Sequence, residues 1–166
     1  MTFSIINSGR GGLGVVELGE MLGWYFIELG YKATSVPNYG PQTRGGYVES
    51  IVVADEKDVL NPIPHQFDVA NVLDFLGMYA VDKVKESGMI IINSTLIKER
   101  ISSKAKVYYL PATKVAEEAS KGKLRERGVA SNSAVFAFLE ERLGGVGGAR
   151  RREIREGLAA KFIKAK

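Results

Sequence analysis

Two glycine-rich stretches contain the residues with the clearest potential for binding chemistry. The first follows an apolar run and places glycines at Gly9, Gly11 and Gly14, which fits the pattern G-x-G-x-x-G. In nucleotide-binding folds this pattern joins a strand to a helix and lets the backbone approach a phosphate. Arg10 adds a positive charge within the turn. The turn therefore favours a phosphate or carboxylate ligand, or it only lets strand and helix pack closely.

The second stretch is "NYGPQTRGG", in which Arg44 stands between Gly40-Pro41 and Gly45-Gly46. Both dipeptides are typical of turns. Loops that follow the first two strands of a doubly wound sheet lie at the same edge, so we expect Arg44 near the glycine turn. Arginine forms two parallel hydrogen bonds to a carboxylate or phosphate. Arg44 is therefore a candidate anion clamp; the alternative is an arginine paired with a surface carboxylate.

A dinucleotide site needs a further anchor, an acidic residue about 20 positions after the glycines, at the end of the second strand. No Asp or Glu occurs between Tyr31 and Tyr47. We therefore expect the glycine turn not to bind NAD.

Residue types for covalent or metal chemistry are scarce. The chain has no cysteine, which excludes disulfides and thiolate ligands for zinc or an iron–sulfur cluster. Its one histidine, His65, lies in the proline-rich stretch "NPIPHQFD" and is expected to be solvated. We therefore expect no catalytic residue and no metal site in this chain.

The apolar patterns predict alternating strands and helices. Val15–Leu29 has apolar residues at helical spacing, with Gly30 as a stop signal. The stretch "MIIINS" is apolar throughout, as in a central strand covered on both faces. Alternation of this kind favours a single doubly wound α/β sheet, mostly parallel with room for antiparallel strands (a mixed sheet), flanked by helices. The other expected strands are Phe3–Ser8, Lys32–Pro37, "YVESIVVAD", "FDVANVLD" and "KVYYLPA", and the other expected helices are Phe75–Ser87, 113–121, 130–143 and 149–166.

A chain of 166 residues is long enough for one well-filled domain. We place this domain at residues 1–146 and a C-terminal helix or tail at 147–166, with the glycine-rich hinge "GGVGG" at 144–148 between them.

The C-terminal region carries most of the positive charge. Residues 141–166 hold eight Lys or Arg and three Glu, whereas the whole chain has a net charge of +4. Ile154, Leu158 and Phe162 form a narrow apolar stripe, so a basic amphipathic helix is expected. Such helices bind membranes or nucleic acids in other proteins. Packing on the chain's own body or on a partner subunit is preferred here, because the stripe lacks interleaved aromatic residues.

The first expected helix has an unusual outer face. Glu17, Glu20, Trp24 and Glu28 share the side opposite the apolar stripe. A tryptophan among glutamates is typical of an interface anchor, although it can also lie flat on its own surface.

Nothing in the sequence indicates export or membrane insertion. Met1–Ile6 lacks a basic start, and no apolar run approaches about 20 residues. We expect a cytoplasmic protein.

Together the two glycine motifs indicate a family. "GRGGLGVVELGEML" followed by "NYGPQTRGGYVESIVVAD" resembles the gamma subunit, or gamma domain, of 2-oxoacid:ferredoxin oxidoreductases. The resemblance continues through "FDVANVLD", "GMIIINSTLI" and "VYYLPATKVAEE" to "GVASNSAVFAFLEERLGG". Leu13 stands where the family usually has glutamine, and Ala137 where glycine is common.

This resemblance implies a Rossmann-like, non-catalytic gamma subunit of a complex that converts a 2-oxoacid and coenzyme A to an acyl-CoA, CO2 and reduced ferredoxin. It implies alpha, beta and delta or ferredoxin-like partner subunits, and ferredoxin as a partner of the complex. Thiamine diphosphate, Mg, 4Fe–4S clusters and coenzyme A are then bound on other subunits. The candidate contacts to coenzyme A or to a partner subunit are Gly9, Arg10, Gly11, Gly12, Gly14, Arg44, Gly45 and Gly46.

Two other functions compete with this interpretation. One is a self-sufficient nucleotide-binding protein with a redox or regulatory role, which the missing acidic anchor disfavours if the nucleotide is NAD. The other is nucleic-acid binding through the basic tail, which would be strongly salt-dependent.

Overall fold

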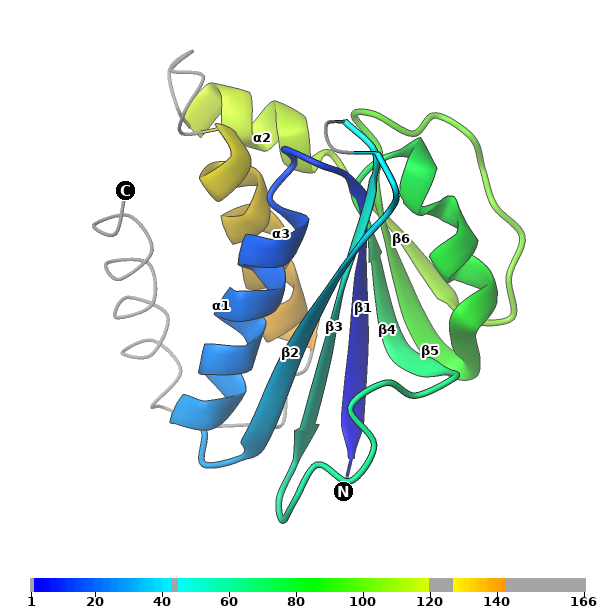
Figure 1. Ribbon diagram of the computed structural model, residues 1–166. Helices are drawn as coiled ribbons and strands as arrows, with labels where there is room; N and C mark the ends of the chain where they lie inside the picture. Colours follow the sequence, from blue (N-terminus) through cyan, green and yellow to red (C-terminus); the bar gives the residue numbers. More distant parts are fainter. Residues whose placement is uncertain (1, 43–44, 120–126, 143–166) are drawn as a thin grey trace.

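A six-stranded sheet forms the centre of the computed structural model, which describes residues 2–42, 45–119 and 127–142 (Figure 1). The strand order is β2-β3-β1-β4-β5-β6. The strands are β1 (Phe3–Arg10), β2 (Lys32–Tyr39), β3 (Tyr47–Asp55), β4 (Phe67–Val72), β5 (Val84–Asn93) and β6 (Lys106–Leu110). The helices are α1 (Val15–Glu28), the 3-10 helix η1 (Phe75–Lys83), α2 (Ala112–Ala119) and α3 (Arg127–Arg142).

The sheet contains both parallel and antiparallel strand pairs, a possibility that the sequence pattern left open. β1, β4, β5 and β6 run parallel, whereas β3 lies between β1 and β2 and is antiparallel to both. Arg10 at the end of β1 pairs with Tyr47 at the start of β3, and Tyr39 at the end of β2 pairs with Val48. The ends of β1 and β2 and the start of β3 therefore meet at one edge of the sheet.

One face of the sheet is covered by α1 and α3 (Figure 1). The predicted apolar stripe of α1 is confirmed, because Val15, Leu18, Leu22 and Tyr25 are all buried. The Tyr25 ring packs edge-on against Phe136 of α3, with ring centres 5.2 Å apart. The two helices therefore form one layer over the sheet.

The opposite face is covered by η1 and by residues 94–105. Ile90 and Ile92 of β5 belong to the core on this side, with Ala80 of η1, whereas Ile91 belongs to the core under α1. The apolar run of β5 is therefore buried on both faces, which confirms the expectation of an interior strand.

The predicted helix Phe75–Ser87 is wrong in its last four residues. A 3-10 helix ends at Lys83, and β5 begins at Val84. Gly88, which directly follows the predicted helix Phe75–Ser87 and is of the residue type that commonly ends a helix, lies within β5, where a Cβ would come 2.7 Å from the carbonyl oxygen of Asp68. This glycine lets the backbones of β4 and β5 approach closely. Sequence spacing alone does not distinguish such a strand glycine from a glycine that ends a helix.

Several predictions concern residues outside the described part of the chain. They include residues 120–121, the hinge at 144–148, the stripe of the C-terminal helix and the boundary between 1–146 and 147–166. Among the helices that the structure describes, none combines the length and apolar character needed to cross a membrane.

Candidate functional site

The glycine turn, residues 11–14, joins β1 to α1 as expected, with Gly14 as the N-cap of the helix. Gly12 and Gly14 have φ angles of 93° and 78°, in the left-handed region that glycine adopts without strain. A Cβ at Gly14 would lie 2.3 Å from Nδ2 of Asn132, which donates a 3.0 Å hydrogen bond to the Gly14 carbonyl. Glycine at these positions therefore has a structural cause, whatever the turn binds.

The two glycine motifs meet at the edge where β1 ends. The Gly11 N–H donates a 2.9 Å hydrogen bond to the carbonyl of Gly46. Gly45, the neighbouring residue in the second loop, has a φ angle of 65°, which also lies in the left-handed region. The structure thus brings Gly45 and Gly46 beside the glycine turn, as predicted, but Arg44 lies outside the described residues.

Arg10 forms an ion pair that sequence reasoning missed. Its Nε lies 3.2 Å from Oδ2 of Asp74, and Oδ1 of Asp74 accepts a hydrogen bond from the Leu76 N–H at the start of η1. An aspartate that follows a strand and precedes a helix is a typical N-cap, which was the available signal. Nearby, Gly9 allows β1 to approach β4, because a Cβ there would lie 3.2 Å from Cβ of Leu73. Arg10 therefore joins the glycine turn to the β4–η1 junction.

The start of α1 already holds a carboxylate. Glu17 lies in the first helical turn, where a negative charge interacts favourably with the helix dipole. Its Oε2 is 3.0 Å from the position that a Cβ of Gly14 would take. An anionic ligand at this helix end would therefore compete with Glu17.

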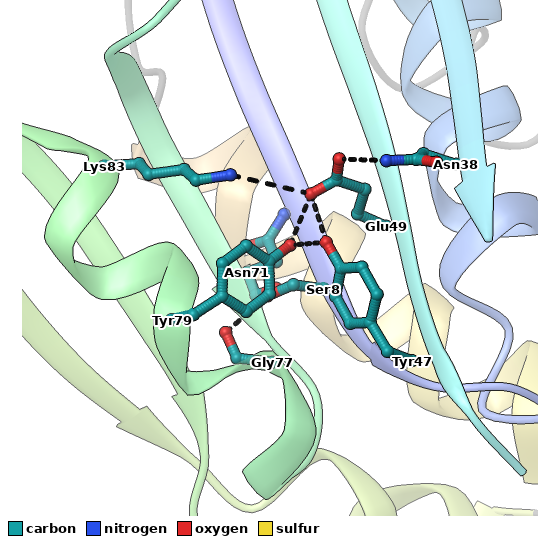
Figure 2. Close-up of polar contacts among 8 residues, drawn as sticks. All are labelled: Ser8, Asn38, Tyr47, Glu49, Asn71, Gly77, Tyr79 and Lys83. Atoms are coloured by element: carbon teal, nitrogen blue, oxygen red, sulfur yellow. Dashed lines mark hydrogen bonds and ion pairs between the residues drawn. The ribbon is translucent and has the colours of Figure 1, made fainter. Parts of the chain in front are cut away.

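A buried polar cluster lies beside the joined loops, and we call it the Glu49 cluster (Figure 2). Glu49 of β3 is 6% exposed, and its carboxylate accepts hydrogen bonds from the phenols of Tyr47 and Tyr79. Nδ2 of Asn38 donates to the same carboxylate at 2.8 Å, and Nζ of Lys83 lies 3.9 Å from it. The cluster therefore connects β2, β3 and η1.

The electrostatics of the cluster favour an ionised carboxylate between neutral phenols. Burial alone would raise the pKa of Glu49, but the hydrogen bonds and the charge of Lys83 outweigh it and hold this pKa below its ordinary value. Burial, and after it the hydrogen bond to Glu49, raises the pKa of Tyr47 and Tyr79 far above the ordinary tyrosine value. The two rings pack edge-to-face with centres 4.8 Å apart.

A second contact fixes η1 against the sheet next to this cluster (Figure 2). Oγ of Ser8 donates to the carbonyls of Gly77 and Asn71, at 3.0 and 3.3 Å. A Cβ at Gly77 would lie only 2.6 Å from the Ser8 carbonyl carbon. The Glu49 cluster and this contact position the elements around the glycine loops.

The described residues contain no group of side chains suited to binding a metal ion. Within residues 2–42, 45–119 and 127–142, no three His, Asp or Glu side chains are grouped so that they could hold a metal ion. His65 is exposed in the loop between β3 and β4.

The turn geometry predicts unequal effects of two alanine substitutions. Gly12→Ala should lower the free energy of unfolding by about 1 kcal/mol, the cost of a left-handed backbone, since nothing lies within 4 Å of the new Cβ. Gly14→Ala should lower it by about 2 kcal/mol, because the buried Asn132 must also shift. Urea unfolding of both variants measures the difference. Equal losses would show that the Asn132 contact does not constrain the turn.

Comparison of the sequence with known proteins finds one matching family model and several similar proteins. The family model described as pyruvate ferredoxin/flavodoxin oxidoreductase matches residues 4–166. Pyruvate synthase subunit PorC of Methanosarcina barkeri is 33% identical over 114 residues, which are 65% of this chain and 63% of that protein. 2-Oxoglutarate synthase subunit KorC of Methanocaldococcus jannaschii is 31% identical over 118 residues, 67% of this chain and 62% of that protein. The chain thus spans a little under two thirds of the length of these curated relatives.

Solved structures share the fold. A keto/oxoacid ferredoxin oxidoreductase gamma subunit from Geobacter sulfurreducens matches with a TM-score of 0.66 and 23% identity, over 98% of both chains. The PORC subunit of pyruvate oxidoreductase from Thermotoga maritima has a TM-score of 0.70 and 21% identity, over 99% of this chain and 84% of that one. 2-Oxoglutarate:ferredoxin oxidoreductase from Magnetococcus marinus has a TM-score of 0.75 and 18% identity, over 99% of this chain but 28% of that one.

Proposed function

The chain belongs to the pyruvate ferredoxin/flavodoxin oxidoreductase family, and we propose that it is the gamma subunit of a 2-oxoacid:ferredoxin oxidoreductase. The family match over residues 4–166 is the observation that carries this proposal. In the proposed complex, a 2-oxoacid is oxidatively decarboxylated with coenzyme A to an acyl-CoA and CO2, and the electrons pass to ferredoxin.

We assign the cofactor chemistry of this reaction to alpha, beta and delta or ferredoxin-like subunits. Thiamine diphosphate with Mg activates the 2-oxoacid, and iron–sulfur clusters carry the electrons. The absence of cysteine from the sequence supports this division, because the clusters are held by cysteine thiolates. We assign to this chain the assembly and positioning of the other subunits, and we place the complex in the cytoplasm.

The proposal is made for 2-oxoacids as a class. The relatives are named for pyruvate and for 2-oxoglutarate, and one from Thermococcus litoralis is a gamma subunit common to pyruvate and ketoisovalerate oxidoreductases. A subunit shared by two such enzymes supports placing substrate selection on other subunits.

We further propose that the joined glycine loops are the contact surface of this subunit toward coenzyme A or a neighbouring subunit. The hydrogen bond between Gly11 and Gly46 holds the two loops together, and Arg44 directly precedes Gly45. Arg10 lies at the same edge of the sheet, and its side chain is 55% exposed. The carboxylate of Glu17 at the helix start argues against a dinucleotide pyrophosphate at this position.

The isolated chain should show no turnover of any 2-oxoacid and no NAD affinity tighter than the millimolar range, on the order of −4 kcal/mol. Acyl-CoA formation and ferredoxin reduction are measured with the pure chain and with the chain after mixing with its co-purifying partners; calorimetry measures NAD binding. Activity only in the mixture supports the proposal. Turnover by the pure chain contradicts it, and micromolar NAD binding favours a self-sufficient nucleotide-binding protein.

A further inference from the structure

Exposed apolar side chains gather at the sheet edge where β4, β5 and β6 end (Figure 1). Phe75 and Leu76, which follow β4, are 63% and 39% exposed. Leu96, which follows β5, is 43% exposed, and Val115, in the first turn of α2 after β6, is 42% exposed. The three strands are parallel, so all four side chains lie at one edge. We call residues 74–76, 94–99 and 111–115 the β4–β6 edge. Exposed apolar groups that gather in this way mark an interaction surface.

Side-chain hydrogen bonds hold the parts of the β4–β6 edge together. Nδ2 of Asn93 donates to the Leu73 carbonyl at 3.0 Å and to Oγ1 of Thr113 at 2.8 Å. Oγ1 of Thr95 accepts a hydrogen bond from the Lys114 N–H at 3.1 Å. The exposed side chains therefore stand on backbone that is already ordered, so binding here costs little conformational entropy.

Backbone donors at the edge are already bonded. The Leu76 N–H in η1 donates to Oδ1 of Asp74 at 2.9 Å, and the Thr113 N–H in α2 donates to Oδ1 of Asn93 at 3.4 Å. The next N–H of α2, that of Lys114, is bonded as described above. Free N–H groups at a helix start are what commonly binds phosphate. The β4–β6 edge therefore presents side chains rather than backbone donors, which suits a protein partner better than a nucleotide.

The exposed charges at this edge are mainly positive. Nζ of Lys98 donates a 2.8 Å hydrogen bond to the Ser94 carbonyl, which places this ammonium group just after β5. Lys114 is exposed in α2, and Arg10, at the end of the neighbouring strand β1, is 55% exposed. Among the residues of the β4–β6 edge, all of which the structure describes, Glu99 has the one exposed carboxylate. Strands lie about 4.8 Å apart, so the cations spread over about 14 Å from β1 to β6, too far for a single anionic group.

We propose that the β4–β6 edge is the docking surface for a segment of a neighbouring subunit in which apolar side chains alternate with aspartate or glutamate. This inference rests on the proposed function, which supplies the neighbouring subunit. The apolar groups of the segment cover Phe75, Leu76 and Leu96, and its carboxylates pair with Lys98 and Lys114. A second copy of this chain, docked through the same edge, would bring like charges face to face, which disfavours that occupant.

Binding of the full-length chain to the purified partner subunits of the proposed oxidoreductase tests this surface. Phe75→Ser combined with Leu96→Ser should raise the Kd of the pair at least tenfold, measured by surface plasmon resonance. The matched control is Leu60→Ser with Ile63→Ser, because these side chains are 92% and 56% exposed in the loop between β3 and β4, at the opposite end of the sheet. The control variant should bind like the wild type. Urea unfolding of both variants should match the wild type, since every replaced side chain is exposed.

Charge reversal provides a second measurement. Lys98→Glu with Lys114→Glu should slow association at least tenfold at low salt and reduce the salt dependence of the association rate. Lys32→Glu with Lys57→Glu makes the same change of net charge at the opposite end of the sheet and should leave the rate within about twofold. Equal slowing by the two pairs would show that net charge acts without a defined docking edge, and would contradict the proposal.

Photocross-linking identifies the occupant. With p-benzoylphenylalanine in place of Phe75, irradiation of the assembled complex should link this position to a partner peptide that contains more Asp and Glu than Lys and Arg. A link to a basic peptide, or to a second copy of this chain, would overturn the inference.

The remaining outcomes separate this inference from the proposed function. If the variant with serine at positions 75 and 96 binds the partner subunits as tightly as the wild type, the inference is wrong and the proposed function stands. A raised KM for coenzyme A with unchanged assembly would likewise refute it, since the edge would then contact the cofactor. If the wild-type chain does not bind the partner subunits at all, the proposed function is wrong and the inference falls with it.

Discussion

Glu49→Gln is expected to lower the free energy of unfolding by about 3 kcal/mol and the melting temperature by about 6–12 °C. The carboxylate accepts hydrogen bonds from Tyr47, Tyr79 and Asn38 at a site that is 6% exposed. Hydrogen bonds to a charged group contribute about 1.5–3 kcal/mol each, and an amide replaces only part of them. Urea and thermal unfolding at neutral pH measure the loss.

Glu20→Gln provides the matched control, since Glu20 is exposed on α1 and should change stability by less than about 0.5 kcal/mol. If both variants lose the same small amount, the Glu49 cluster does not hold β3 to η1.

The pH dependence of stability gives this prediction a second readout. The folded pKa of Glu49 is lowered, so its contribution is complete above the ordinary glutamate pKa and is lost as the pH falls through the folded value. Glu49→Gln should therefore flatten the acid side of the stability profile. The folded pKa of Tyr47 and Tyr79 is raised, so their contribution is complete below about pH 10 and is lost above it. Phenolate absorbance should accordingly show that Tyr47 and Tyr79 ionise only on unfolding.

Arg44→Lys should impair the assembled complex while leaving the fold intact. The residue directly precedes Gly45 and Gly46, and Gly46 is bonded to the glycine turn through Gly11. Lysine keeps the charge but cannot form two parallel hydrogen bonds to a phosphate or carboxylate. The loss of about 1.5–3 kcal/mol corresponds to a ten- to more than hundredfold fall in affinity.

Two measurements distinguish a contact of Arg44 to coenzyme A from a contact to a partner subunit. They are steady-state kinetics of the reconstituted complex with varied coenzyme A, and gel filtration of its subunits. A raised KM for coenzyme A identifies a ligand contact, and a weakened assembly identifies an interface. Arg100→Lys is the control, because Arg100 stacks 4.3 Å from the ring centre of Tyr109 on β6, the far edge strand from β2. If Arg44→Lys matches wild type in both assays, the functional interpretation of this loop is wrong.

Local patterns predicted most of the elements, because apolar spacing and glycines act within a few residues. The stripe of α1, the turn before it and the interior strand with Ile90–Ile92 were all found this way. The pattern failed at Gly88, where a strand glycine and a helix-ending glycine are the same residue type.

The contacts that position the candidate site depend on pairings that no local pattern contains. Tyr47 and Tyr79 are 32 residues apart, and their contact requires both the antiparallel register of β3 and the placement of η1. The Arg10–Asp74 pair likewise requires β4 to lie beside β1. Only the N-cap position of Asp74 was visible in the sequence.

The hydrogen bond from Asn132 to the Gly14 carbonyl has a consequence for the order in which the chain becomes native. These residues are 118 positions apart, so at about 5–20 residues per second the ribosome adds Asn132 roughly 6–24 s after Gly14. During that interval β1, α1, β2 and β3 can pair as one contiguous unit, whereas the carbonyl at the head of α1 still lacks its partner. The turn that meets the second glycine loop is therefore completed late in synthesis, and a nascent chain that stops before α3 carries this sheet edge without the finished glycine turn.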